Sequence, residues 1–164
     1  MHPAAYSYVA ERVAALNLDR GDILDLGGRE VNGSIRGLFP RAELFVSVDI
    51  EPHPSVDIVA DAADLDLSDR FDVVVSTECL EHTERAADIV AAAHRHLVAG
   101  GSFVATMAGV GREPHSATGG PVGSEFYRNV AVVELEEWLR SAGFAVWSVD
   151  VDGTDLRCVA VRGE

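Results

Sequence analysis

Three aspartates and a glycine pair give the chain its clearest potential for ligand chemistry. Asp25 lies in a short apolar stretch that runs into Gly27-Gly28, and Asp49 and Asp61 each follow a further apolar stretch. A single aspartate at a strand end is commonly a turn residue, whereas three at successive strand ends beside a glycine turn favour a ligand. Asp49 lies 22 residues after Gly27, where a carboxylate can accept both hydroxyls of a ribose. The glycines allow close approach to the backbone, and free N–H groups of such a turn can hold an anion.

The glycine turn differs from the fingerprint of dinucleotide-binding folds. That fingerprint reads G-x-G-x-x-G after the first strand, whereas Gly27-Gly28 is followed by Arg29, and the next glycine is Gly33. The spacing argues against a pyrophosphate on the following helix and therefore against a nicotinamide dehydrogenase. A smaller, zwitterionic ligand would still fit the turn.

The surrounding sequence predicts the elements that hold these residues. Short apolar segments separated by helical patterns are typical of a parallel sheet that is covered on both faces. Gly21 is expected to end the first helix, and Ala99-Gly100-Gly101 the helix before the fifth strand, because glycine suits a left-handed cap. The predicted fold class is α/β: a Rossmann-like three-layer sandwich with a mostly parallel seven-stranded sheet and an antiparallel C-terminal hairpin strand. The expected strands cover 23–26, 44–48, 57–60, 71–75, 102–107, 144–151 and 156–161, and the expected helices or helical turns cover 4–18, 34–39, 84–97 and 133–142.

Length, charge and cysteine content limit the class of protein. The chain has 164 residues, which suits a single domain, 1–164, and is too short for two. A net charge of -14 opposes a phosphate backbone, so we expect no nucleic-acid substrate. No apolar run reaches the roughly 20 residues of a membrane span, and we expect neither a membrane association nor a signal peptide. Cys79 and Cys158 form no C-x-x-C pair, which predicts reduced thiols and a cytoplasmic location.

The six histidines show no metal-binding pattern in the sequence. His94 and His96 lie two residues apart on an expected helix and therefore face different directions. The chain contains neither an H-E-x-x-H motif nor a cysteine cluster. We therefore predict no bound metal.

Four segments resemble, in order, the motifs of class I S-adenosylmethionine-dependent methyltransferases, and most closely those of their small-molecule branch. They read ILDLGG, VSVDI, VADAADL and FDVVVSTECLEH. The resemblance covers residues 22–107, and LEEWLRSAGF at 135–144 adds to it. It implies a sheet whose seventh strand is inserted antiparallel, S-adenosyl-L-methionine as cofactor, and methyl transfer to a small or medium acceptor, at oxygen or nitrogen rather than carbon.

The resemblance also implies the contacts to the cofactor. The family usually reads D-x-G-x-G-x-G, and this chain has Arg29 where the second of these glycines is expected. Arg29 either pairs with the cofactor carboxylate or points to solvent. The implied contacts are Asp25, Gly27 and Gly28 at the methionine part, Ser76 and Thr77 beside the sulfonium, Asp49 on the ribose, Ile50 against the adenine, Asp61 at its amino group and the Ala62 backbone at the ring.

The stretch 108–125 predicts a loop over the acceptor. Seven of its 18 residues are glycine or proline, and a long loop in a small domain is usually functional or disordered. The expected layout is an N-terminal helix over the site at 1–20, a cofactor-binding core at 22–107, an acceptor loop at 108–130, and a C-terminal helix and hairpin at 131–164.

His115 and Tyr127, in or just after this loop, are the candidates for a general base. Such a base adds about 10²–10⁴-fold when the acceptor is a hydroxyl. The alternative is that both residues only order the loop, and His82 is expected to support the cofactor.

Two further questions stay open at the level of the whole chain. A catalytically inactive, methyltransferase-like binding or interaction protein would carry the same motifs. A homodimer would shield the site.

Overall fold

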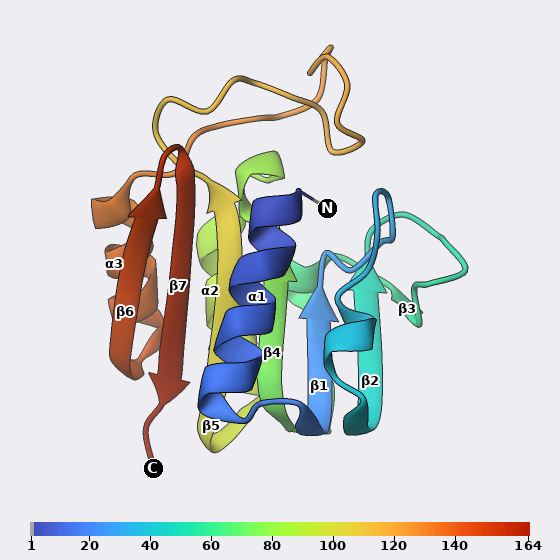
Figure 1. The fold of residues 1–164 in the computed structure, drawn as a ribbon, viewed down its shortest axis with the longest axis vertical. Helices are drawn as coiled ribbons and strands as arrows, with labels where there is room; N and C mark the ends of the chain where they lie inside the picture. Colours follow the sequence, from blue (N-terminus) through green and yellow to red (C-terminus); the bar gives the residue numbers. More distant parts are fainter. Residues whose placement is uncertain (1) are drawn as a thin grey trace.

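The computed structural model describes residues 2–164 and shows a seven-stranded sheet (Figure 1). The strand order is β3-β2-β1-β4-β5-β7-β6. Neighbouring strands run parallel except at β7, which is antiparallel to both β5 and β6. The predicted sheet and its inserted antiparallel strand are therefore confirmed. The strands are β1 (Arg20–Leu26), β2 (Arg41–Asp49), β3 (Ile58–Val59), β4 (Phe71–Thr77), β5 (Leu97–Ala108), β6 (Phe144–Asp152) and β7 (Asp155–Arg162).

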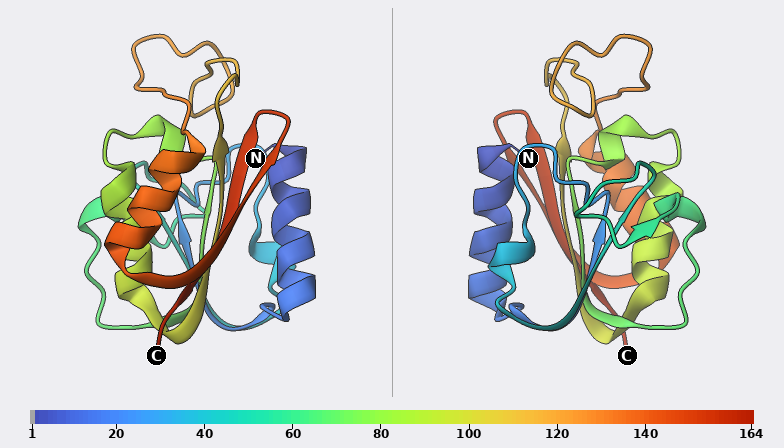
Figure 2. Two further views of the ribbon diagram at one scale, coloured as in Figure 1. Left: turned by 90° about the vertical axis from the view of Figure 1, so that its left-hand side faces the viewer. Right: turned by 90° about the vertical axis from the view of Figure 1, so that its right-hand side faces the viewer.

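Helices cover both faces of the sheet, as Figure 2 shows. Helix α1 packs on one face over an apolar cluster, and α2 and α3 pack side by side on the other face over a second cluster. These three layers confirm the predicted α/β sandwich. Within residues 2–164, no helix is long and apolar enough to cross a membrane. The helices are α1 (Pro3–Leu16), α2 (Ala86–His96) and α3 (Val132–Ala142), and the 3-10 turns are η1 (Arg36–Leu38), η2 (Ala62–Asp64) and η3 (Leu80–His82).

Two of the expected glycine caps lie inside strands instead. Helix α1 ends before Asn17, which adopts a left-handed φ of 55°, and Gly21 belongs to β1. Helix α2 ends at His96, so Gly101 belongs to β5. A Cβ at Gly21 would lie 2.7 Å from Asp72 Cγ, and one at Gly101 would lie 3.1 Å from the Asp72 carbonyl oxygen. Gly21 therefore leaves room for the Asp72 side chain, and Gly101 lets β5 approach the backbone of β4 closely.

The carboxyl ends of β1, β2 and β4 meet at one edge of the sheet (Figure 1). Asp49 ends β2, Thr77 ends β4, and Asp25 lies one residue before the end of β1. The loop 109–131, between β5 and α3, arches over this edge. Helix α1 begins near the same edge, but none of its residues, all of which the structure describes, lines the cavity found there. A role for α1 over the site stays a prediction.

Candidate active site

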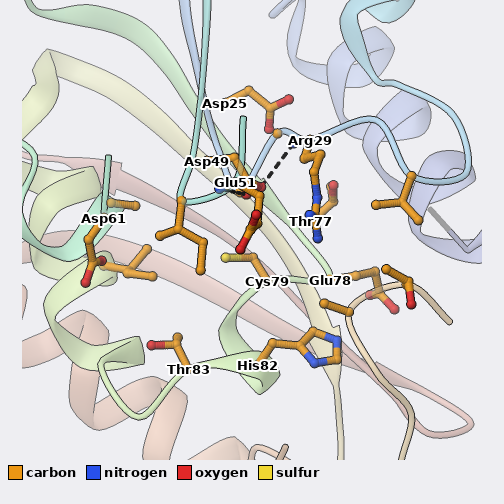
Figure 3. Close-up of a pocket in the computed structure, with 18 of the residues that line it drawn as sticks. Asp25, Arg29, Asp49, Glu51, Asp61, Thr77, Glu78, Cys79, His82 and Thr83 are labelled. Atoms are coloured by element: carbon orange, nitrogen blue, oxygen red, sulfur yellow. Dashed lines mark hydrogen bonds between the residues drawn. The ribbon is translucent and has the colours of Figure 1, made fainter. Parts of the chain in front are cut away.

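A cavity of about 540 Å³ lies at the carboxyl edge of the sheet (Figure 3). Sites for small molecules and cofactors usually measure roughly 300–1,000 Å³. The wall comes from the turn after β1, the end of β2, the η2 and η3 turns, and the loop 109–131. Eight of the predicted cofactor residues line it: Asp25, Gly27, Gly28, Asp49, Ile50, Asp61, Ala62 and Thr77.

Asp25 is a buried acid on the wall of this cavity. Its side chain is 3% exposed, and its Oδ1 has no hydrogen-bond partner within residues 2–164. Burial raises the pKa of Asp25 to about 7, against the opposing charge of Arg36 and with a smaller contribution from Asp49. Because an unpaired buried polar atom is costly, Oδ1 is a site for an N–H donor of a ligand.

Arg29 places the opposite charge at the same end of the cavity. Figure 3 shows its side chain reaching into the cavity, so the orientation toward solvent is not the one adopted. In the described part of the chain, its buried Nε finds no hydrogen-bond partner. Arg29 and Asp25, four residues apart, thus offer an unpaired donor and an unpaired acceptor. This pair complements the carboxylate and ammonium of an α-amino acid.

Asp49 is held at the tip of β2 with both carboxylate oxygens oriented. Oδ2 accepts a hydrogen bond from the Arg29 backbone N–H at 3.2 Å, and Oδ1 accepts one from the Glu51 backbone N–H at 2.9 Å. Each oxygen keeps a further lone pair, because a carboxylate oxygen can accept more than one hydrogen bond. The carboxylate can therefore still accept two hydroxyls from a ligand in the cavity.

The other side of the cavity combines an exposed apolar side chain with a fixed acid. Ile50 is 65% exposed, so a ring packed against it would remove apolar surface from water. Asp61 Oδ1 accepts the Ala63 backbone N–H at 2.9 Å, and Oδ2 pairs with Arg85 Nη1 at 2.9 Å. These contacts fix the Asp61 carboxylate beside the backbone of Ala62 without using all its lone pairs.

Gly27 and Gly28 are required by packing within the chain. A Cβ at Gly27 would lie 2.5 Å from Cys79 Sγ, and one at Gly28 would lie 2.6 Å from Asp25 Oδ2. Their N–H groups both donate to the Val48 carbonyl oxygen, at 2.9 and 3.0 Å. The expectation that this glycine turn offers free N–H groups to an anion is therefore wrong for these two residues.

Ser76 and Thr77, expected side by side at the cofactor, separate at the end of β4. Successive strand residues face opposite sides, and Thr77 lines the cavity. Ser76 is fully buried, and its Oγ donates to the Leu26 carbonyl oxygen at 2.9 Å. Ser76 therefore ties β4 to β1, and it is not among the described residues that line the cavity.

The two candidate bases, His115 and Tyr127, pack against His82 at the other end of the site. His82 lines the cavity, whereas neither His115 nor Tyr127 is among the described lining residues. The ring centroids are 5.2 Å apart for His82 and His115, and 4.9 Å apart for His115 and Tyr127. Tyr127 also lies 5.6 Å from His82, centroid to centroid. The structure therefore packs both candidate bases against His82, a residue of the cavity wall, while neither of them is among the described residues of the wall itself.

Glu81 is a buried acid of this region that the sequence analysis did not single out. Its Oε1 accepts the Ala108 backbone N–H at 3.1 Å. Burial, followed by the like charge of Glu78, raises the pKa of Glu81 well above its usual range. Burial and the neighbouring His115 lower the pKa of His82 to about 4, so its imidazole is neutral near pH 7. The sequence feature that points to these residues is the run STECLEH at 76–82, which carries Glu78, Glu81 and His82.

Solved structures with the same fold include several methyltransferases. An S-adenosylmethionine-dependent methyltransferase from Clostridium acetobutylicum has a TM-score of 0.72 at 12% identity, over 100% of this chain and 93% of that chain. The 1,6-didemethyltoxoflavin-N1-methyltransferase of Burkholderia thailandensis, with bound 1,6-didemethyltoxoflavin and S-adenosylhomocysteine, has a TM-score of 0.71 at 19% identity, over 98% and 79%. Magnesium protoporphyrin IX methyltransferase from Synechocystis, with bound S-adenosylhomocysteine, has a TM-score of 0.69 at 16% identity, over 98% and 83%. These likenesses show a shared fold.

The sequence itself adds a domain match. The family described as "Methyltransferase domain" matches residues 36–105, which contain β2 to β4 and most of β5. No curated protein has a sequence that matches the chain significantly. The domain match and the shared fold both support the expected class of enzyme, a class I methyltransferase that uses S-adenosylmethionine as methyl donor.

Proposed function

We propose that this protein transfers the methyl group of S-adenosylmethionine to an oxygen or nitrogen atom of a small or medium acceptor. The observation that carries this proposal is the unpartnered pair of Asp25 and Arg29 at one end of the cavity, followed along its wall by Asp49. These groups match the amino-acid end of S-adenosylmethionine and its ribose, in the order in which the cofactor carries them. When bound, the cofactor supplies a methyl group on a positively charged sulfur.

The chain's own residues would bind and orient the reactants. Arg29 pairs with the cofactor carboxylate, Asp25 accepts a hydrogen bond from its ammonium, and Asp49 accepts the two ribose hydroxyls. Ile50 and Asp61 form the adenine side. Alignment of this kind can lower a barrier by roughly 7–11 kcal/mol, and methyl transfer needs little more than an acceptor lone pair in line with the methyl group.

The acceptor would enter at the other end, between Thr77, His82 and the loop 109–131. The neutral imidazole of His82 can accept a hydrogen bond from an acceptor O–H or N–H group. His115 and Tyr127 support the His82 ring from behind, so we now propose them as positioning residues. The loop residues that line this end are Ala117, Thr118, Glu125 and Phe126.

Calorimetric titration with S-adenosylhomocysteine tests the cofactor assignment. Arg29→Met and Asp49→Ala each remove hydrogen bonds to a charged group, worth about 1.5–3 kcal/mol each, so the affinity should fall about 10- to 100-fold. Arg140→Met removes an exposed ion pair with Glu137 and a contact over the Trp147 ring, and it should bind like the wild type because Arg140 is not among the described residues that line the cavity. Equal affinities of Arg29→Met and wild type would contradict the assignment of Arg29. A wild type that binds no S-adenosylhomocysteine would favour the inactive, interaction-protein alternative.

A further inference from the structure

A cluster of metal-type ligands lies at the acceptor end of the cavity. Glu81 and His82 come from η3, and His115 comes from the loop 109–131. One ligand atom from each of these three residues lies within 4.8 Å of the other two. The residues are far apart in the sequence, which is why histidine spacing alone gave no sign of a shared site.

Two of these side chains have buried atoms without partners. Glu81 is fully buried, and its Oε2 has no hydrogen-bond partner among the residues described. His82 Nδ1 is also buried and unpartnered within that part of the chain. Oε2 stays unpartnered in either protonation state of Glu81. A protonated Oε2 would need an acceptor and an ionised one a donor, and the described residues offer neither. Buried polar atoms of this kind call for a ligand that satisfies them.

The third residue is held in place by its surroundings. His115 Nδ1 lies 3.0 Å from the Glu113 carbonyl oxygen, and this contact favours the tautomer whose Nε2 is free to act as a ligand. The Tyr127 ring packs against the His115 ring. The loop is also tied to η3, because the Arg128 backbone N–H donates to the Glu81 carbonyl oxygen at 2.9 Å. The two halves of the cluster are therefore fixed relative to one another.

The donor set indicates the kind of ion. One carboxylate and two imidazoles form the ligand set of several catalytic zinc sites and of other first-row transition-metal sites with open coordination positions. Magnesium and calcium prefer oxygen ligands throughout. We propose that Glu81, His82 and His115 bind one divalent first-row transition-metal ion of the Zn²⁺ type. This proposal reverses the expectation of no metal that was drawn from the sequence.

The place of the cluster suggests which part of the reaction the ion would serve. Of the three proposed ligands, only His82 is among the described residues that line the cavity, so the ion would lie at the wall of the acceptor end. An ion there would lower the pKa of an acceptor hydroxyl bound to it, and the resulting oxygen anion keeps a lone pair for the methyl group. An amine bound to the ion would give up its only lone pair, so hydroxyl-bearing acceptors would be favoured over amines. This second step rests on the proposed methyl transfer, whereas the metal site itself does not.

Titration of tag-free protein, stripped with a chelator, tests the site without any assay of activity. We expect the wild type to bind one Zn²⁺ per chain by calorimetry, and to give the visible absorption of a protein-bound ion when Co²⁺ is used as the probe. His115→Ala removes one ligand and should weaken Zn²⁺ binding at least ~10-fold, because even indirect changes to such sites cost 10–100-fold. His53→Ala, in an exposed turn, is the matched control and should bind like the wild type.

A second variant and a second ligand separate the outcomes. Glu81→Gln keeps the shape of the buried side chain and should weaken Zn²⁺ binding as well, with its fold checked by circular dichroism. Binding that is absent in the wild type, or unchanged in His115→Ala, overturns the proposal. S-adenosylhomocysteine titrated into the metal-free wild type reports on the proposed function separately: if it binds while Zn²⁺ does not, only the metal site fails, and the reverse result leaves the metal site standing.

Discussion

Single residues of the cavity carry unsatisfied groups that a ligand would complete. Asp25, near the end of β1, and Arg29, in the turn that follows, both keep buried polar atoms without partners within residues 2–164. Burial of this kind costs stability in the free protein and is recovered when a ligand of opposite polarity binds. An acid with a raised pKa, such as Asp25, therefore marks a place where the fold gives up stability for binding.

The pH dependence of stability should report on Asp25. Because its pKa in the folded protein is about 7, above the usual value near 4, the folded state keeps a proton that the unfolded state has released between these values. The unfolding free energy therefore falls as the pH rises from about 4 to about 7, by up to ~1.4 kcal/mol per pH unit. Asp25→Asn should remove this decline, as measured by urea denaturation from about pH 5 to about pH 8.

The matched control for this experiment is Asp69→Asn, at an exposed position. Its stability profile should keep the slope of the wild type, since other titrating groups are common to all three proteins. If the profiles of Asp25→Asn and wild type ran parallel over the whole range, Asp25 would be ionised in the folded protein. The assignment of a buried, protonated acid to the cavity wall would then be wrong.

Among the structural elements, the turn after β1 is shaped by close packing with its neighbours. Gly28→Ala would bring a methyl group to 2.6 Å from Asp25 Oδ2 and also against Ser47. We expect a loss of about 1–3 kcal/mol in the free energy of unfolding, as for other overpacked sites, and weaker binding of S-adenosylhomocysteine because Asp25 must move. Gly37→Ala is the control, since a Cβ there would meet no atom of the described residues within 4 Å. Equal free energies of unfolding for the two variants would show that the turn can shift to accommodate the methyl group without loss of stability.

The order of the elements could be predicted because it depends on local patterns. Short apolar segments that alternate with helical ones specify a covered parallel sheet, and the carboxyl ends of such strands meet at one edge. Asp49 and Asp61 could therefore be assigned to the cavity before its shape was known. Glycine was harder to interpret. Gly21 and Gly101 could equally cap helices or make room for atoms of a neighbouring strand, and only the position of Asp72 distinguishes these roles.

The loop end of the cavity, which we propose as the acceptor end, could not be predicted in the same way. The path of the loop 109–131 depends on contacts that are distant in the sequence, among them the ion pairs of Arg112 with Glu78 and Asp155. No local periodicity encodes these pairs. Loop composition predicts His115 near the acceptor, and that role stays a prediction, whereas its meeting with Glu81 follows only from the folded loop.

The molecule as a whole is strongly acidic, and its positive charge is carried by arginine alone. All 13 basic residues are arginines, against 27 acidic residues. At least eight of these arginines form ion pairs with aspartate or glutamate. Most of the positive charge is therefore neutralised by neighbouring acids, and little of it is available to attract an anionic partner.

This charge distribution predicts that the protein does not bind duplex DNA. A protein gains affinity for DNA by neutralising phosphates and releasing their counterions, and a chain with a net charge of -14 repels them instead. Fluorescence anisotropy of a labelled duplex should stay constant up to micromolar protein at about 150 mM salt, and also at about 50 mM salt, where non-specific binding is stronger. A rise in anisotropy that weakens with added salt would contradict this prediction. Paired arginines would then have to exchange their carboxylate partners for phosphates, and nucleic acid would become an acceptor class to test.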